Sequence, residues 1–105
     1  MLTLPIKRCW YDMIVSGDKL EEYREPSEYW TKRLRKARFV QHVDYTYDGL
    51  KLRIRAGYKK DAPSAIITLW KLDRGRGITC WGAEPGKEYL RLHIAKVEEE
   101  VKWDG

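Results

Sequence analysis

The chain has 105 residues, of which 43% are hydrophobic and 35% are charged, and its net charge is +5. This length provides for one hydrophobic core, so we expect a single domain over residues 1–105. The composition excludes a disordered chain, and no apolar run approaches the roughly 20 residues of a membrane span. The N-terminus becomes charged too soon for a signal peptide. We therefore expect a cytoplasmic globular protein with no membrane partner.

The first elements lead into a cluster of charged side chains. Residues 2–6 predict a short strand, which Pro5 limits to an edge or end position. Residues 7–16 carry apolar side chains at helical spacing and predict a helix. Gly17 follows at the position where a helix ends in the left-handed conformation that glycine tolerates. Beyond Gly17 the chain is expected to extend.

The next strand is expected to hold the candidate site. In a strand over residues 20–25, Glu22 and Arg24 point to the same face. Lys19 stands at the entrance of this strand, and Lys7 lies at the preceding strand-to-helix corner. Such a constellation suits a polar, anionic ligand, although Lys, Glu and Arg together also form ordinary surface ion pairs. The candidate ligand-binding cleft therefore consists of Lys7, Lys19, Glu22 and Arg24.

The remaining pattern predicts an α+β fold. Ser27 is a suitable N-cap for a second helix, and Asp48-Gly49 is typical of a tight hairpin turn. Two helices in the first third, followed by strands with regular turn signals, favour a β-barrel with helices attached. The strand at 65–72 is the most apolar and is expected to be central. The expected elements from here on are a helix at 27–38 and strands at 39–47, 50–55, 65–72 and 89–98.

Positive charge is concentrated in the middle of the sequence. Residues 32–60 hold ten lysines and arginines against two aspartates, giving +8, while the rest of the chain carries −3. This asymmetry favours an anionic partner, although basic residues also solvate exposed faces. The alternation in 50–55 places three cations on one face, and Tyr58 offers a ring for base stacking. The candidate nucleic-acid-binding surface consists of Arg33, Lys36, Arg53, Arg55, Tyr58, Lys59 and Lys60.

The sequence gives no reason to expect a metal ion or other cofactor. Cys9, His42, Cys80 and His93 contain no close ligand pair of the usual zinc spacing. We expect both cysteines to be reduced and buried as small apolar residues. We expect His93 to be a hydrogen-bonded structural residue on the last strand.

The pattern G-x-K-x-x-E-x-R is filled by Gly17, Lys19, Glu22 and Arg24. It resembles the signature of the ASCH domain family, in particular its small bacterial and phage members. The resemblance implies a PUA-like β-barrel of about five or six strands and an RNA-related function. It extends over nearly the whole chain, and the further matching segments are Leu4–Lys7, the aromatic-rich helix predicted at 7–16, Arg24–Glu25, Tyr29–Trp30, Arg33, Gly57–Tyr58 and Trp81–Gly86.

Three classes of function follow. The first is an RNA- or nucleotide-binding domain, with phosphates on the basic surface and a base or nucleotide end in the cleft. The second is a small metal-independent enzyme of the ribonuclease or amidohydrolase type, acting on RNA or modified nucleosides. In that case Lys19, Glu22 and Arg24 are the candidate catalytic residues, with Glu22 as general acid or base. The third is a protein-interaction module with a protein partner.

The resemblance does not transfer a nucleophile to this chain. ASCH relatives include ribonucleases and an amidohydrolase that acts on N4-acetylated cytidine, which carries a threonine three residues after the motif lysine. Here that position is Glu22, and the nearest threonines, Thr3 and Thr31, lie outside the motif. Binding is therefore expected to come before any turnover.

Overall fold

The computed structural model describes residues 1–41 and 49–100, with side chains placed for 1–37 and 49–100. None of the helices in these ranges is long and apolar enough to cross a membrane. The elements are β1 (Thr3–Ile6), α1 (Arg8–Ser16), β2 (Glu21–Arg24), α2 (Glu28–Gln41), β3 (Leu50–Ala56), β4 (Ser64–Arg76), the 3₁₀ helix η1 (Thr79–Trp81) and β5 (Glu88–Glu99).

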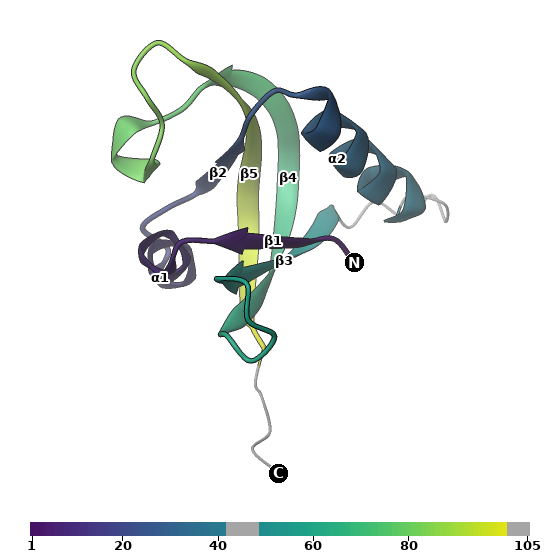
Figure 1. Cartoon of the computed structure of the whole chain (residues 1–105), viewed down its shortest axis with the longest axis vertical. Coiled ribbons are helices and arrows are strands. Elements are labelled where there is room, and N and C mark those ends of the chain that lie inside the picture. The colour runs from purple at the N-terminus through teal and green to yellow at the C-terminus, as the bar shows by residue number, and fades with distance from the viewer. Residues whose placement is uncertain (42–48, 101–105) are drawn as a thin grey trace.

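The five strands form one mixed sheet in the order β1-β3-β4-β5-β2 (Figure 1). β1 and β3 run parallel, and the other three pairings are antiparallel. The long hairpin β4–β5 is the frame of the sheet, because β3 pairs with the first half of β4 while β2 pairs with the first half of β5. The predicted α+β class, with two helices from the first third, is therefore confirmed. The central position predicted for residues 65–72 is also confirmed.

The expected closed barrel is not observed, because the sheet remains open between its two edge strands, β1 and β2. Pro5 lies in β1, as predicted for an edge, and has no N–H with which to continue a ladder. Its carbonyl oxygen instead accepts a hydrogen bond from Nη2 of Arg24 on β2, at 3.1 Å. A side chain thus spans the gap that backbone pairing would otherwise close.

The core is formed by side chains of the sheet together with both helices. On β3, Leu50, Leu52 and Ile54 are buried, which confirms the inward face predicted for that strand. Ile14 of α1 and Leu34 of α2 pack into the same cluster. In Figure 1, α1 lies to the left of the strands and α2 to their right. Burial of these aliphatic side chains supplies most of the favourable free energy of folding.

The strand predicted at 39–47 is wrong over its first three residues. α2 continues through Gln41, so the β-branched and aromatic character of Phe39-Val40 is overridden by the helix that precedes it. Residues 42–48, and with them Asp48 of the expected hairpin turn, lie outside the described residues. Gly49, the second residue of the expected turn, has a φ of +86°. The strand that follows it, β3, pairs with β4 and β1.

The turn at Gly17 connects α1 to the charged strand β2. Gly17 has a φ of +88°, and its N–H donates to the carbonyl oxygen of Ile14. The N–H groups of Asp18 and Lys19 both donate to the carbonyl of Met13, at 2.9 and 3.0 Å. The helix ending predicted at this glycine is confirmed, and it sets the direction in which the Lys19 side chain enters the fold.

Replacing Gly17 by alanine is expected to lower the free energy of unfolding by about 1–2 kcal/mol, the cost of the left-handed conformation for an L-residue. An added Cβ meets no atom within 4 Å, so the loss reports backbone strain alone. Gly17→Asn is the matched control and should lose less, because asparagine tolerates this conformation better. Urea unfolding of both variants measures the difference, and equal losses would contradict the assignment.

Candidate functional site

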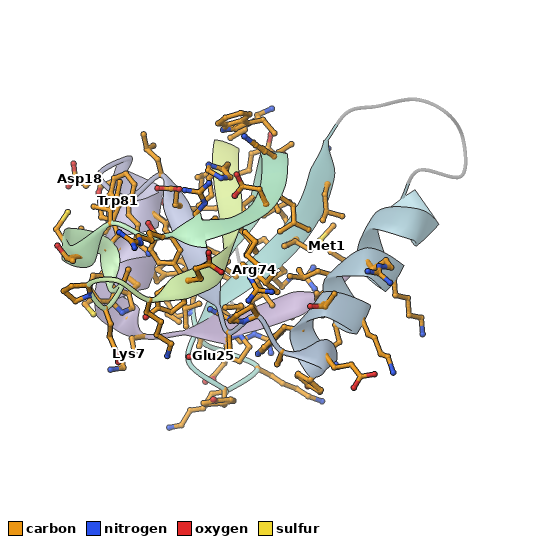
Figure 2. All side chains as sticks on the ribbon, turned by 90° about the horizontal axis from the view of Figure 1, so that it is seen from above. Met1, Lys7, Asp18, Glu25, Arg74 and Trp81 are labelled. Carbon is orange, nitrogen blue, oxygen red and sulfur yellow. The ribbon has the colours of Figure 1, made fainter. Side chains whose placement is uncertain are left out.

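A pocket of about 410 Å³ opens where the two edges of the sheet face one another. Lys7 and Trp81, which both line it, lie at the same end of the molecule in Figure 2. Six of the twelve lining residues are aromatic, against 12% of the whole chain, so the pocket is strongly enriched in flat apolar surfaces. The lining residues are Pro5, Ile6, Lys7, Trp10, Glu22, Tyr23, Arg24, Trp30, Tyr58, Trp81, Gly82 and Tyr89.

Glu22 and Arg24 lie together on β2, as the strand alternation predicts. Glu22 is only 5% exposed, and its Oε1 accepts from the N–H of Tyr23 at 3.0 Å. Nη1 of Arg24 lies 3.4 Å from the same oxygen and donates to the Tyr23 carbonyl at 2.8 Å. Arg24 is therefore held by the backbone of both edge strands, while Glu22 is held by its own strand. Neither side chain is free to reorient independently.

Lys19 stands behind the pocket wall and does not line it. Its side chain is fully buried, and Nζ donates to the Trp81 carbonyl at 2.7 Å and lies 3.9 Å from Glu22 Oε1. The ammonium also lies 5.2 Å from the ring centre of Trp10 and 4.9 Å from that of Tyr23. Burial lowers the pKa of Lys19, and the neighbouring Glu22 carboxylate opposes this shift. Lys19 thus positions the walls of the pocket from behind.

The rim of the pocket carries exposed groups from two loops. Lys7 is exposed at the start of α1, and Tyr58 follows β3 with 88% of its surface exposed. The ring of Tyr58 therefore has nearly all of its area left to cover with a ligand. Lys59 and Lys60 are exposed beside it in the same loop. Lys7, which was predicted for the cleft, and Tyr58, which was predicted for the nucleic-acid-binding surface, thus line the same pocket.

A stack of cations and rings connects α2 to the pocket. Ser27 caps the helix, since its Oγ accepts from the N–H of Trp30 at 3.2 Å. The Trp30 ring lies 5.2 Å from the guanidinium of Arg24 and 5.8 Å from that of Arg33. Arg33 also lies 5.1 Å from the ring of Tyr29. The predicted surface residue Arg33 is therefore close to the cleft, through Trp30.

The other basic candidates are not brought to the pocket. Arg53 forms a two-point ion pair with Glu100, at 2.5 and 3.1 Å, so its charge has a partner within the chain. The three cations that alternation places on one face of β3 therefore give no separate reason to infer an anionic ligand there. Arg55 is half-buried, and its Nε has no hydrogen-bond partner among the described residues. Lys36 is exposed on α2, one turn beyond Arg33.

The two cysteines and His93, which the sequence analysis considered as metal ligands, lie outside the pocket lining. Cys9 on α1 and Cys80 on η1 are both exposed, so the predicted burial is wrong. His93 is held as predicted, with Nε2 2.9 Å from Asp73 and Nδ1 3.4 Å from Glu21. Over residues 1–41 and 49–100, no group of three potential ligands could hold a metal ion.

Tyr23 ties β2 to the segment that follows β4. Its hydroxyl accepts from the N–H of Ile78 at 2.9 Å and donates to Glu21 Oε2 at 3.2 Å. Its ring packs with Tyr89, at 5.5 Å between centres, and an added Cβ on Gly77 would lie 2.8 Å from the Tyr23 ring. Burial raises the pKa of Tyr23 to about 12. Sequence spacing alone could not identify these contacts, because Gly77, Ile78 and Tyr89 lie more than fifty residues from Tyr23.

Comparisons with protein-family models, with curated proteins and with solved structures found no match for this chain. The pocket itself combines aromatic walls, one buried carboxylate and exposed cations at its rim. Aromatic faces accept planar rings, a carboxylate accepts N–H groups, and exposed lysines bind phosphate. These three chemistries together are suited to a nucleotide.

Replacing Lys19 by methionine is expected to lower the free energy of unfolding by about 3 kcal/mol. The substitution keeps the volume but leaves the Trp81 carbonyl without its donor and the buried Glu22 with one cation fewer. Lys7→Met removes the same charge from an exposed position and should change stability by less than about 0.5 kcal/mol. Guanidinium unfolding compares the two, and similar values would show that Lys19 is not a structural ion.

Tyr23→Phe is expected to flatten the loss of stability at alkaline pH. Burial raises the pKa of the Tyr23 hydroxyl from its ordinary value of 10.0 to about 12, so the folded state holds this proton more tightly than the unfolded state. The resulting stabilisation is complete below about pH 10 and is lost as the pH rises through about 12. Buried Lys19 acts in the opposite sense, but it is present in both proteins, so their difference isolates Tyr23.

Urea midpoints between pH 8 and 12 measure this effect. Tyr58→Phe removes an exposed hydroxyl and should reproduce the wild-type slope. A Tyr23→Phe slope equal to that of the wild type would contradict the proposed burial of the phenol.

Proposed function

We propose that this chain is a cytoplasmic ASCH-like domain that binds single-stranded RNA or a nucleotide, with a base in the pocket and phosphates at its rim. The observation that carries the proposal is the aromatic pocket between the open sheet edges, with Glu22 in its wall and lysine at its mouth. Stacking of a base on an aromatic ring contributes about 1–3 kcal/mol and requires little sequence specificity. A flat, half-open pocket of this kind suits a base that is not paired in a duplex.

The aromatic lining decides which end of the nucleotide enters. A phosphate placed inside would have to leave water among six aromatic side chains, whereas a base stacks on such rings. Lys7 is exposed and lines the pocket, and Lys59 is exposed next to the lining residue Tyr58, so both are available to phosphate. Contacts from such groups set the position of the strand and most of its electrostatic affinity.

The resemblance to ASCH domains supports the same location. Apart from Tyr89, the lining residues fall within the segments that carry the resemblance, although these segments are far apart in the sequence. We propose that the fold is related to PUA-like barrels and that in this chain the seam of the barrel is open. The Arg24 side chain then stands where a closed barrel would continue its backbone pairing.

Binding is preferred to catalysis because of the position of Lys19. A residue that acts on a ligand must reach it, yet the Lys19 side chain is fully buried and its Nζ is engaged by the Trp81 carbonyl. Glu22 and Arg24 do border the pocket, but they contact one another and the backbone. Catalysis is therefore the alternative, and cleavage of the RNA is measured alongside its binding.

Tyr58→Ala is expected to weaken binding of a mixed ten-nucleotide RNA about tenfold, because its exposed ring is lost as a stacking surface. Tyr58→Phe should retain the affinity, since it keeps the ring. Trp70→Ala is the matched control, because Trp70 is 57% exposed but does not line the pocket. Fluorescence anisotropy of labelled RNA measures all four proteins.

The same titrations at 50 and 200 mM salt test the phosphate contacts. Two contacts to a single strand, from Lys7 and Lys59, predict a loss of about sevenfold in affinity, and a Lys7→Gln, Lys59→Gln double variant should lose less. Lys96→Gln removes one exposed positive charge from β5, outside the pocket lining, and should keep the wild-type dependence of affinity on salt. Absence of binding at low salt would refute the proposal, and multiple-turnover cleavage abolished by Glu22→Gln would replace it with an enzyme.

A further inference from the structure

One oxygen of the pocket wall lacks a hydrogen-bond partner. Glu22 is more than nine-tenths buried, and its Oε2 has no donor among the described residues. The other oxygen, Oε1, is surrounded by the N–H of Tyr23, Nη1 of Arg24 and, at 3.9 Å, Nζ of Lys19. The donors of this wall thus converge on one oxygen and leave its neighbour unsatisfied.

An unsatisfied buried acceptor is unfavourable, and a ligand that supplies a donor removes this cost on binding. Glu22 borders the pocket, so the donor can come from a molecule held between its aromatic walls. The hydrogen bond would form away from bulk water, where such a bond discriminates strongly between ligands that can and cannot make it.

The surrounding charges indicate a neutral donor. Lys19 and Arg24 already place two positive charges beside the single carboxylate, and Lys7 adds another at the rim. A cationic ligand such as a methylated ammonium would meet this excess of positive charge. A carbonyl oxygen placed against Oε2 would be repelled, because carboxylates only accept hydrogen bonds.

Neutral planar rings with an exocyclic amino group meet both requirements. Cytosine and adenine present an N–H₂ group next to a ring nitrogen, and a carboxylate is a known type of partner for the cytosine amine. The only base N–H of uracil stands between two carbonyl oxygens, so aiming it at Oε2 also brings carbonyl oxygens toward the carboxylate. Cytosine and adenine can instead turn an exocyclic amine toward Oε2, and uracil has no such group.

We propose that Glu22 selects amino-bearing bases over uracil, through a hydrogen bond from the exocyclic amine to Oε2. This inference rests on the proposed function, since it assumes that a base enters the pocket. Glu22 is then the residue that determines specificity, while Tyr58 and the rim lysines contribute affinity that does not depend on the base.

The test compares two RNA hexamers, oligocytidylate and oligouridylate, at pH 7.5 and one salt concentration. Both carry the same phosphates, so the electrostatic contribution cancels in the ratio of their dissociation constants. We expect the wild-type protein to bind oligocytidylate about tenfold more tightly. Cytidine and uridine monophosphates, titrated in the same way, repeat the comparison without neighbouring nucleotides.

Glu22→Gln should reduce or invert this ratio. The amide oxygen can keep the hydrogen bond from the Tyr23 N–H, which places the amide NH₂ at the position of Oε2 and converts an acceptor into a donor. Stacking differences between the two bases are common to both proteins, so the change in the ratio isolates the hydrogen bond. Glu21→Gln is the matched control on the next residue of β2, whose side chain bonds the Tyr23 hydroxyl, and it should keep the wild-type ratio.

The outcomes separate this inference from the function on which it rests. A wild-type protein that binds both hexamers equally, with Tyr58→Ala weakening both, overturns the selectivity and leaves RNA binding standing. Binding of neither hexamer overturns both proposals. A wild-type preference for cytosine that Glu22→Gln leaves unchanged, in a variant with wild-type thermal unfolding, assigns the selectivity to another residue and overturns the role of Glu22.

Discussion

The hydrogen bond between Arg24 and the Pro5 carbonyl joins the two edges of an otherwise open sheet. The same guanidinium holds the Tyr23 carbonyl, approaches Glu22 and lies over the ring of Trp30 at the start of α2. One side chain therefore connects both edge strands, the second helix and the buried carboxylate. Since all of these groups border the pocket, the shape of the pocket and the seam of the sheet depend on each other.

Behind this seam lies a buried pair of charges, Lys19 and Glu22. Burying ions is expensive, and an apolar pair of similar volume is often as stable. What the ions contribute is direction, because Lys19 Nζ fixes the Trp81 carbonyl and stands between the rings of Trp10 and Tyr23. The buried pair thus gives the polar and aromatic groups of this wall defined positions.

Local pattern was sufficient at β2, where alternation placed Glu22 and Arg24 on one face, and at Gly17, which marked the end of α1. It does not report distant partners: Arg53 was assigned to a surface for an anionic ligand, and in the structure it pairs with Glu100, 47 residues later. It was also wrong at residues 39–41, where the preceding helix continues in spite of the β propensity of Phe39 and Val40.

The strand order also has a consequence for how the chain folds. Glu22 pairs with Leu92, and Leu4 pairs with Ile54, so neither edge strand finds its partner nearby in the sequence. Sheets made of such non-local pairings fold slowly, on the millisecond to second scale. During synthesis at about 5–20 residues per second, β2 waits roughly 4–14 s for its partner strand to be made. The charged strand that forms the pocket wall is therefore made early and paired only at the end.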